Sequence, residues 1–203
     1  MGMMGQATFE REEWLGLDAE VTQLRRGDPQ ALGTLLARYQ NRLYRYLLRL
    51  VRDPALAEDL FQQTWLRVAA NIRRYDPRRS FEAWLFSVAR HLAIDQLRRR
   101  RPESLDEPLA SGDTPGELLP AAGPGALDRL LAQERAALLA RALDDLPAYY
   151  REVLSLRFEE EMKLEEIAEV LDAPLSTVKT RLRRALERLR QRLAARYPGE
   201  DWR

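Results

Sequence analysis

The chain has no cysteine and a single histidine among its 203 residues. Without cysteine it has no disulfide framework, no thiolate metal ligand and no thiol nucleophile. No apolar run approaches the length that crosses a membrane, and the first residues lack the basic segment and apolar core of a secretion signal. We therefore expect a cytoplasmic protein that does not insert into membranes.

An arrangement of residues suited to catalysis is also missing. The sequence has no glycine-rich phosphate loop, and the histidine has no second ligand or nucleophile at a recognisable spacing. The carboxylate pairs at 58–59, 144–145 and 165–166 are adjacent on predicted helices, so the two members of each pair diverge around the axis. We expect no enzymatic activity, no metal site, no cofactor and no small-molecule substrate. The alternative, a metal-dependent enzyme that processes nucleic acid, lacks a convergent ligand set.

The formal net charge of +1 is small because blocks of opposite sign cancel. Residues 159–172 contain seven carboxylates and one lysine, whereas residues 173–196 contain eight Lys or Arg and one glutamate. Apolar side chains recur at helical spacing through both blocks, and Pro174 interrupts them. The pattern predicts two amphipathic helices joined by a short turn, with Ser176 as the N-cap of the second.

The second of these helices is the cationic one. Its polar side chains, which suit phosphates and base edges, include Ser176, Thr177, Lys179, Thr180, Arg183 and Arg184. Small polar residues at its N-terminal end favour a helix-turn-helix that enters a major groove. The alternative is a solvated basic helix on an ordinary helical bundle.

The remaining sequence predicts an all-α fold with two small helical domains joined by a flexible acidic linker. Residues 102–127 are rich in proline, glycine and carboxylates and contain no Lys or Arg, which is typical of an extended linker. On either side we expect domains at 18–101 and 128–203, the second containing the helix-turn-helix, with residues 1–17 as an N-terminal extension. Aspartates before Pro29 and Pro54 are typical helix starts. The negative charge of this linker is able to mimic or repel a nucleic-acid backbone, and a plain spacer without such a role is at least as good an interpretation.

Two surfaces of the first domain are candidates for binding. The helix over residues 54–75 turns an outward face that combines a leucine with amides and alanines, as in helices that contact another protein. The members of this face are Asp59, Gln62, Gln63, Leu66, Ala69 and Ala70. A single exposed leucine also occurs without any function.

The second surface lies in residues 71–101, which hold nine arginines interleaved with aromatic side chains. Cations beside exposed rings suit single-stranded nucleic acid, because the backbone is neutralised while bases stack. The candidates are Arg73, Arg74, Tyr75, Arg78, Arg79, Trp84, Ser87, His91 and Arg98. Trp84 also falls on a predicted apolar stripe with Phe81, Leu85, Val88 and Leu92, so a core position is the alternative for this ring.

Four motifs in this order resemble one protein family. They are "AEDLFQQTWLRV" at 57–68, "FEAWLFSVARHLAIDQLRRRR" at 81–101, "LPAYYREVLSLRF" at 146–158, and the helix-turn-helix. Together they resemble the extracytoplasmic-function (ECF) group of bacterial RNA polymerase sigma factors, over about residues 18–195. The resemblance implies a promoter-specificity subunit that binds polymerase core, recognises and helps melt promoter DNA, and directs initiation.

By the resemblance, the helix at 54–75 binds the beta-prime clamp helices, and the arginine-rich surface binds the minus-ten element with one base flipped from the stack. The helix-turn-helix reads the minus-thirty-five element, the second domain contacts the beta flap, and an anti-sigma factor is a further partner. His91 departs from the family's frequent asparagine. Lys163 stands where a capping Ser or Thr is common, so we expect that helix to fray or to begin earlier. A stand-alone operator-binding regulator is the alternative.

Overall fold

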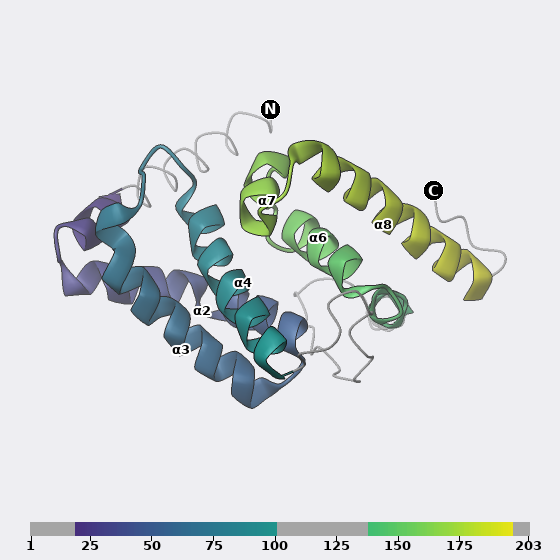
Figure 1. The fold of residues 1–203 in the computed structure, drawn as a ribbon, viewed down its shortest axis with the longest axis horizontal. Coiled ribbons are helices and arrows are strands. Elements are labelled where there is room, and N and C mark those ends of the chain that lie inside the picture. The colour runs from purple at the N-terminus through teal and green to yellow at the C-terminus, as the bar shows by residue number, and fades with distance from the viewer. Residues whose placement is uncertain (1–18, 101–137, 197–203) are drawn as a thin grey trace, which may run out of the picture. The chain divides into compact units, whose positions relative to one another are not determined.

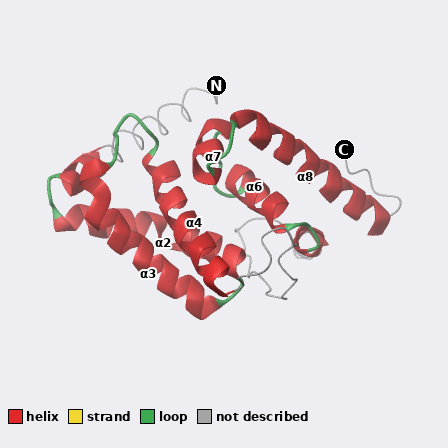
Figure 2. Cartoon of the chain, in the orientation of Figure 1, coloured by secondary structure: helices red, strands yellow, loops and turns green. Residues whose placement is uncertain are grey.

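The computed structural model describes residues 19–100 and 138–196, and the regular secondary structure in these ranges is entirely helical (Figure 2). This confirms the predicted all-α fold class. The predicted N-terminal extension and linker lie outside the described residues, as do residues 128–137 of the second predicted domain. The described chain divides into two compact units, which correspond essentially to its two ranges.

The first unit is built from long helices that the caps and periodicity of the sequence specify. They are α2 (Pro29–Val51), α3 (Pro54–Asn71) and α4 (Phe81–Arg100), with a short 3-10 helix η1 (Ile72–Arg74) after α3 (Figure 1). Residues 19–25 form a further helical segment before α2. α2, α3 and α4 pack pairwise against one another.

Each long helix of the first unit begins at a side-chain cap. The Asp28 carboxylate accepts a hydrogen bond of 2.9 Å from a backbone amide of α2, and Asp53 accepts one of 3.1 Å from α3. The Ser80 hydroxyl accepts a bond of 3.3 Å from an amide in the first turn of α4. Since the first amides of a helix have no partner within it, each such cap stabilises its helix by about 1 kcal/mol.

The core of the first unit combines aliphatic and aromatic side chains. Leu35, Leu43 and Leu47 of α2 are fully buried, and burial of one such side chain is worth about 1.5–3 kcal/mol. Tyr46 packs against Phe86 of α4 with ring centroids 5.1 Å apart. This packing fixes which faces of α3 and α4 remain in solvent.

The buried face of α4 differs from the predicted stripe. Trp84, Val88 and Leu92 are half-buried, whereas Phe86 and Ala89 are fully buried. The predicted stripe follows the largest apolar side chains, but small alanines allow two helices to approach closely and so define the contact face here. Trp84 therefore lies at the edge of the core, with part of its ring in solvent.

The second unit contains α6 (Ala148–Phe158), α7 (Leu164–Leu171) and α8 (Leu175–Arg196), and residues 138–144 are also helical. α6 packs against α8, and the side chains of Val153, Ile167, Val178 and Ala185 are fully buried. No helix in either described range has the length and apolar character needed to span a membrane.

α7 and α8 form the predicted helix-turn-helix. Asp172 has a φ of 48° in the left-handed region, and the Ala173 amide donates to the Ala168 carbonyl at 3.0 Å, which closes α7 in a Schellman turn. The prediction that Ser176 caps α8 is wrong. α8 begins at Leu175, and the Pro174 carbonyl accepts its first hydrogen bonds, so Ser176 is exposed within the first turn.

The start of α7 is also better supported than the sequence predicts. The Glu166 carboxylate reaches back and accepts a hydrogen bond of 2.8 Å from the Lys163 amide. This is the glutamate half of a capping box, which satisfies an unpaired amide without a Ser or Thr at the cap. α7 begins at Leu164 and no earlier, so the expectation of an earlier start is wrong.

Candidate nucleic-acid interface

The outward face of α3 is exposed along its length. All six side chains predicted to contact a protein lie in solvent: Asp59, Gln62, Gln63, Leu66, Ala69 and Ala70. Leu66 is 71% exposed, the most of any large apolar side chain in the described residues. The opposite side of α3 is held in the core by Leu60 and Val68, so α3 cannot turn Leu66 inward without exposing these side chains.

A cleft with a volume of about 310 Å³ lies where η1 leads into α4. Its lining residues, which define the tryptophan cleft, are Arg74, Tyr75, Asp76, Arg79 and Trp84. The ring centroids of Tyr75 and Trp84 lie 5.1 Å apart, and the Tyr75 hydroxyl donates a hydrogen bond to the Arg79 carbonyl. The structure thus brings together four of the residues predicted to bind a melted strand.

Tyr75 is not the exposed aromatic side chain that the sequence predicts. It is 5% exposed, because its ring packs edge-on against Phe81 as well as against Trp84. The edge that lines the cleft is therefore small, and the ring serves mainly to hold Trp84 in place. A role for Tyr75 in binding nucleic acid stays a prediction.

The cations around this cleft differ in how far their charge is offset. Arg78 donates to the Asp76 carboxylate at 3.1 Å, and this hydrogen bond holds the pKa of Asp76 below its usual value. Arg73 and Arg74 are exposed and have no ion-pair partner among the described residues. Sequence reasoning missed Asp76. Because of this carboxylate, the charge of Arg78 is less available to a nucleic acid than the charges of Arg73 and Arg74.

Three predicted residues lie further along α4 and do not line the tryptophan cleft. His91 is exposed, and its Nδ1 lies 2.6 Å from the Ser87 carbonyl, so Nδ1 is the protonated donor and Nε2 remains for another contact. Ser87 is half-buried, with its hydroxyl donating to the Trp84 carbonyl at 2.8 Å. Arg98 is exposed.

The predicted reading face of α8 is directed to solvent. Ser176, Lys179, Thr180, Arg183 and Arg184 are exposed, and Thr177 is half-buried. The Thr180 hydroxyl donates to the Ser176 carbonyl at 2.9 Å. Val178 and Ala185 hold the opposite side of α8 in the core, so the cationic face is presented outward.

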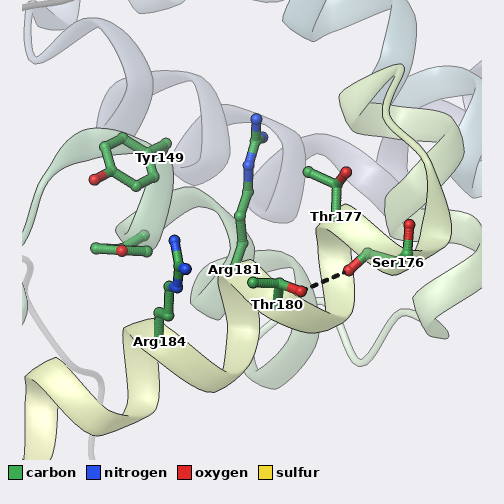
Figure 3. Close-up of a pocket in the computed structure, with 7 residues that line it drawn as sticks. Tyr149, Ser176, Thr177, Thr180, Arg181 and Arg184 are labelled. Atoms are coloured by element: carbon green, nitrogen blue, oxygen red, sulfur yellow. Dashed lines mark hydrogen bonds between the residues drawn. The ribbon is translucent and has the colours of Figure 1, made fainter.

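A second cleft, of about 360 Å³, adjoins this reading face (Figure 3). Its lining residues, which define the tyrosine cleft, are Tyr149, Tyr150, Ser176, Thr177, Thr180, Arg181 and Arg184. The sequence reasoning missed the two tyrosines and Arg181. The pair of tyrosines directly after Pro147 was the available signal, but nothing in the sequence shows that the start of α6 lies beside α8.

The described residues contain no group of three His, Cys, Asp or Glu side chains placed to hold a metal ion. Instead, the first unit presents an arginine-lined cleft with a tryptophan and a helix face with one exposed leucine, and the second unit presents an exposed cationic helix. These features define a helix-turn-helix DNA-binding protein.

Comparisons with known proteins identify the family. Residues 35–103 match Sigma-70 region 2, and residues 142–191 match Sigma-70, region 4. ECF RNA polymerase sigma factor SigW of Bacillus subtilis is 32% identical over 176 residues, which is 85% of this chain and 94% of SigW. ECF RNA polymerase sigma factor SigL of Mycobacterium tuberculosis is 37% identical over 149 residues, or 73% and 80% of the two chains.

Two solved structures are also similar. CnrH in complex with the cytosolic domain of CnrY matches with a TM-score of 0.61 at 24% identity, over 89% of this chain and 98% of CnrH. RpoE in complex with the anti-sigma factor NepR from Bartonella quintana matches with a TM-score of 0.59 at 25% identity, over 81% and 98%.

The chain belongs to the ECF RNA polymerase sigma factors of the sigma-70 family. It is a non-enzymatic subunit that directs promoter recognition by RNA polymerase and transcription initiation. This confirms the function predicted from the four motifs. The match to region 2 accounts for the first unit, which the alternative of a stand-alone operator-binding regulator left unexplained.

Proposed function

We propose that the sigma factor binds polymerase core and promoter DNA through two domains, at residues 18–101 and 128–203, which residues 102–127 connect. The outward α3 face docks on the beta-prime clamp helices of polymerase core. The tryptophan cleft and the arginines around it hold the melted minus-ten strand. α8 reads the duplex minus-thirty-five element, and the second domain also contacts the beta flap.

The observation that carries the docking proposal is the exposure of Leu66, 71% in solvent on a helix whose other side is buried. A few well-packed side chains near the centre of a protein interface carry most of its affinity, once the surrounding contacts exclude water. The amide and alanine neighbours of Leu66 add hydrogen-bonding groups and a flat surface, and they leave little bulk to keep a second helix away.

The minus-ten proposal is supported by the tryptophan cleft. Trp84 is half-buried, so it offers part of a ring in a fixed position, while Arg74 supplies charge at the cleft edge. Stacking of a base on such a ring is worth about 1–3 kcal/mol, which offsets part of the cost of taking the base out of the duplex. The cleft would in this way help to melt the promoter without nucleotide hydrolysis.

A regulatory partner and a location follow from the family. Because RpoE of Bartonella quintana was solved with the anti-sigma factor NepR, we infer that an anti-sigma factor also binds this chain. We also infer a cytoplasmic location, because a subunit of bacterial polymerase works where that polymerase transcribes.

The docking proposal is tested with Leu66→Arg in a pull-down with bacterial core polymerase. We expect at least about a tenfold loss of affinity, because a charge would be buried in an apolar contact while the free protein tolerates it in solvent. Gln40→Arg, which adds the same charge at an exposed position of α2, is the matched control and is expected to bind normally. Unchanged affinity of Leu66→Arg would remove the α3 face from the interface.

A further inference from the structure

The tyrosine cleft is not explained by base recognition through α8 alone. Its far wall comes from α6, where Tyr149 is 48% exposed although it is a large aromatic side chain. The ring centroids of Tyr149 and Tyr150 lie 4.3 Å apart. Figure 3 shows that Arg181 and Arg184 extend from α8 toward the side on which Tyr149 lies. Two helices therefore contribute polar groups to one open cleft.

The chemistry of the cleft is that of an anion site. The seven lining residues include two guanidinium groups and five hydroxyls and no carboxylate. Neither Arg181 nor Arg184 has an ion-pair partner among the described residues. Guanidinium groups and hydroxyls that line one cleft without a protein anion are suited to the oxygens of a phosphate.

Tyr149 keeps its proton in this cationic setting. A hydrogen bond with Tyr150 raises the pKa of Tyr149, against the smaller opposite effect of the charges of Arg188 and Arg181. A bond that raises the pKa of a phenol favours its neutral form, so the Tyr149 hydroxyl donates to the Tyr150 oxygen, while the nearby guanidinium groups supply positive charge. An incoming anion would take over this proton from Tyr150 at small net cost, because the bond is exposed to water.

The position of the cleft on α8 indicates that its ligand is a backbone phosphate and not the edge of a base. Arg181 is half-buried on the flank of α8, between the exposed Thr180 and Arg184 and the core. When a recognition helix enters a major groove, its outward edge faces the bases and its flanks face the sugar-phosphate backbone. The tyrosine cleft lies on such a flank.

We propose that the tyrosine cleft binds one backbone phosphate of the minus-thirty-five duplex, with Arg181 neutralising its charge and the Tyr149 hydroxyl contacting one of its oxygens. The inference rests on the proposed role of α8. It adds a contact from α6, outside the helix-turn-helix, that fixes how α8 is rotated in the groove. The base-reading side chains would then be positioned by a sequence-independent contact.

The test uses polymerase holoenzyme reconstituted with the full chain, on a promoter mapped by run-off transcription. Arg181→Ala is expected to weaken binding about tenfold on every upstream sequence and to lower the salt slope by about one. Tyr149→Phe, which removes only the hydroxyl, is expected to give a smaller loss with the same base preferences. Arg190→Ala, which removes the same charge from an exposed position outside the cleft, is the matched control.

Neutral methylphosphonates placed one at a time along the upstream duplex identify the contacted phosphate. A methylphosphonate at that position should weaken binding of the wild type. It should not weaken binding of Arg181→Ala any further, because this variant already lacks the contact with that phosphate. The inference is overturned if Arg181→Ala behaves like Arg190→Ala, or if its loss is confined to one base pair. A holoenzyme that initiates at no promoter, or that tolerates both Lys179→Ala and Arg183→Ala, would instead contradict the proposed function.

Discussion

The two units present their arginines in different surroundings. In the first unit, the exposed Arg74 and Arg79 line a cleft with Trp84 and Tyr75, at the edge of a core that contains the aromatic pair Tyr46 and Phe86. In the second unit the arginines follow α8 along a regular helix, and the aromatic pair in its described residues is Tyr149 and Tyr150. Arginines thus lie beside a tryptophan ring in the first unit, whereas in the second unit they lie beside the hydroxyls of serine, threonine and tyrosine.

The difference shows how one charge type serves two forms of DNA. A ring at the edge of a core offers a flat surface to an unstacked base, which a duplex does not expose. A helix lined by hydroxyls and cations fits the major groove, where base edges and phosphates are both within reach. The first unit is therefore suited to melted DNA and the second to intact duplex.

The largest expected effects concern the separate cores. Phe86→Ala should destabilise the first unit by about 3–5 kcal/mol, and Ile167→Ala should destabilise the second by about 2–5 kcal/mol, because each leaves a cavity. Calorimetry of the full chain is expected to show two transitions, with each variant shifting its own. One joint transition, moved equally by both variants, would show that the two units unfold as one.

The next largest effects are expected for the cations on the exposed face of α8. Lys179→Ala and Arg183→Ala should each cost about 1–3 kcal/mol if the side chain contacts a base, with relaxed specificity at one position. A phosphate contact would instead weaken all sequences and lower the salt slope by about one. Binding of holoenzyme to a footprinted promoter separates the two roles, with Arg192→Ala, exposed further along α8, as control. Wild-type behaviour of both variants would exclude α8 as the reader.

A smaller effect is expected at His91. If its Nε2 contacts a melted base, His91→Ala should slow open-complex formation by a factor that corresponds to about 1 kcal/mol. A template already unpaired at the minus-ten element should largely restore the rate, since melting is no longer required. Asp95→Ala, also exposed on α4, controls for a change at the helix surface. Equal defects on duplex and unpaired templates would remove His91 from base capture.

The smallest effect concerns Asp76. Its pKa lies below 3.8 because Arg78 donates to the ionised carboxylate, so the stability from this pair is present above pH 3.8 and lost as pH falls through the lower, folded-state value. The pair is exposed, so its contribution to stability is small. NMR titration should show the Asp76 pKa returning toward 3.8 in Arg78→Ala. A pKa that stays low in the variant would show that another group lowers it.

The fold was predictable because its determinants are local. Aspartate caps before Pro29 and Pro54 and the periodic leucines of α2 are visible in the sequence, and the structure confirms both. The start of α8 was misplaced because Ser176 and Pro174 are both common at helix starts, and the Schellman turn at Asp172 decides between them. The choice depends on the geometry of the preceding helix.

The candidate site was less predictable because it depends on contacts between helices. A helical wheel gives the angle of Trp84 but not how far Tyr75 and Phe81 cover it, and it does not show that Tyr75 itself is buried. The approach of Tyr149 to Arg181 likewise requires the packing of α6 on α8. The exposure of Leu66, in contrast, follows from α3 alone and was predicted.

The most direct test of this division compares Trp84→Ala with Arg183→Ala in holoenzyme, on duplex promoter and on the same promoter unpaired at the minus-ten element. If the first unit holds melted DNA, the unpaired template should largely restore initiation by Trp84→Ala. Arg183→Ala should stay equally defective on both templates, because its contact is with upstream duplex. Rescue of both variants, or of Arg183→Ala alone, would contradict the assignment of melted DNA to the first unit and of upstream duplex to the second.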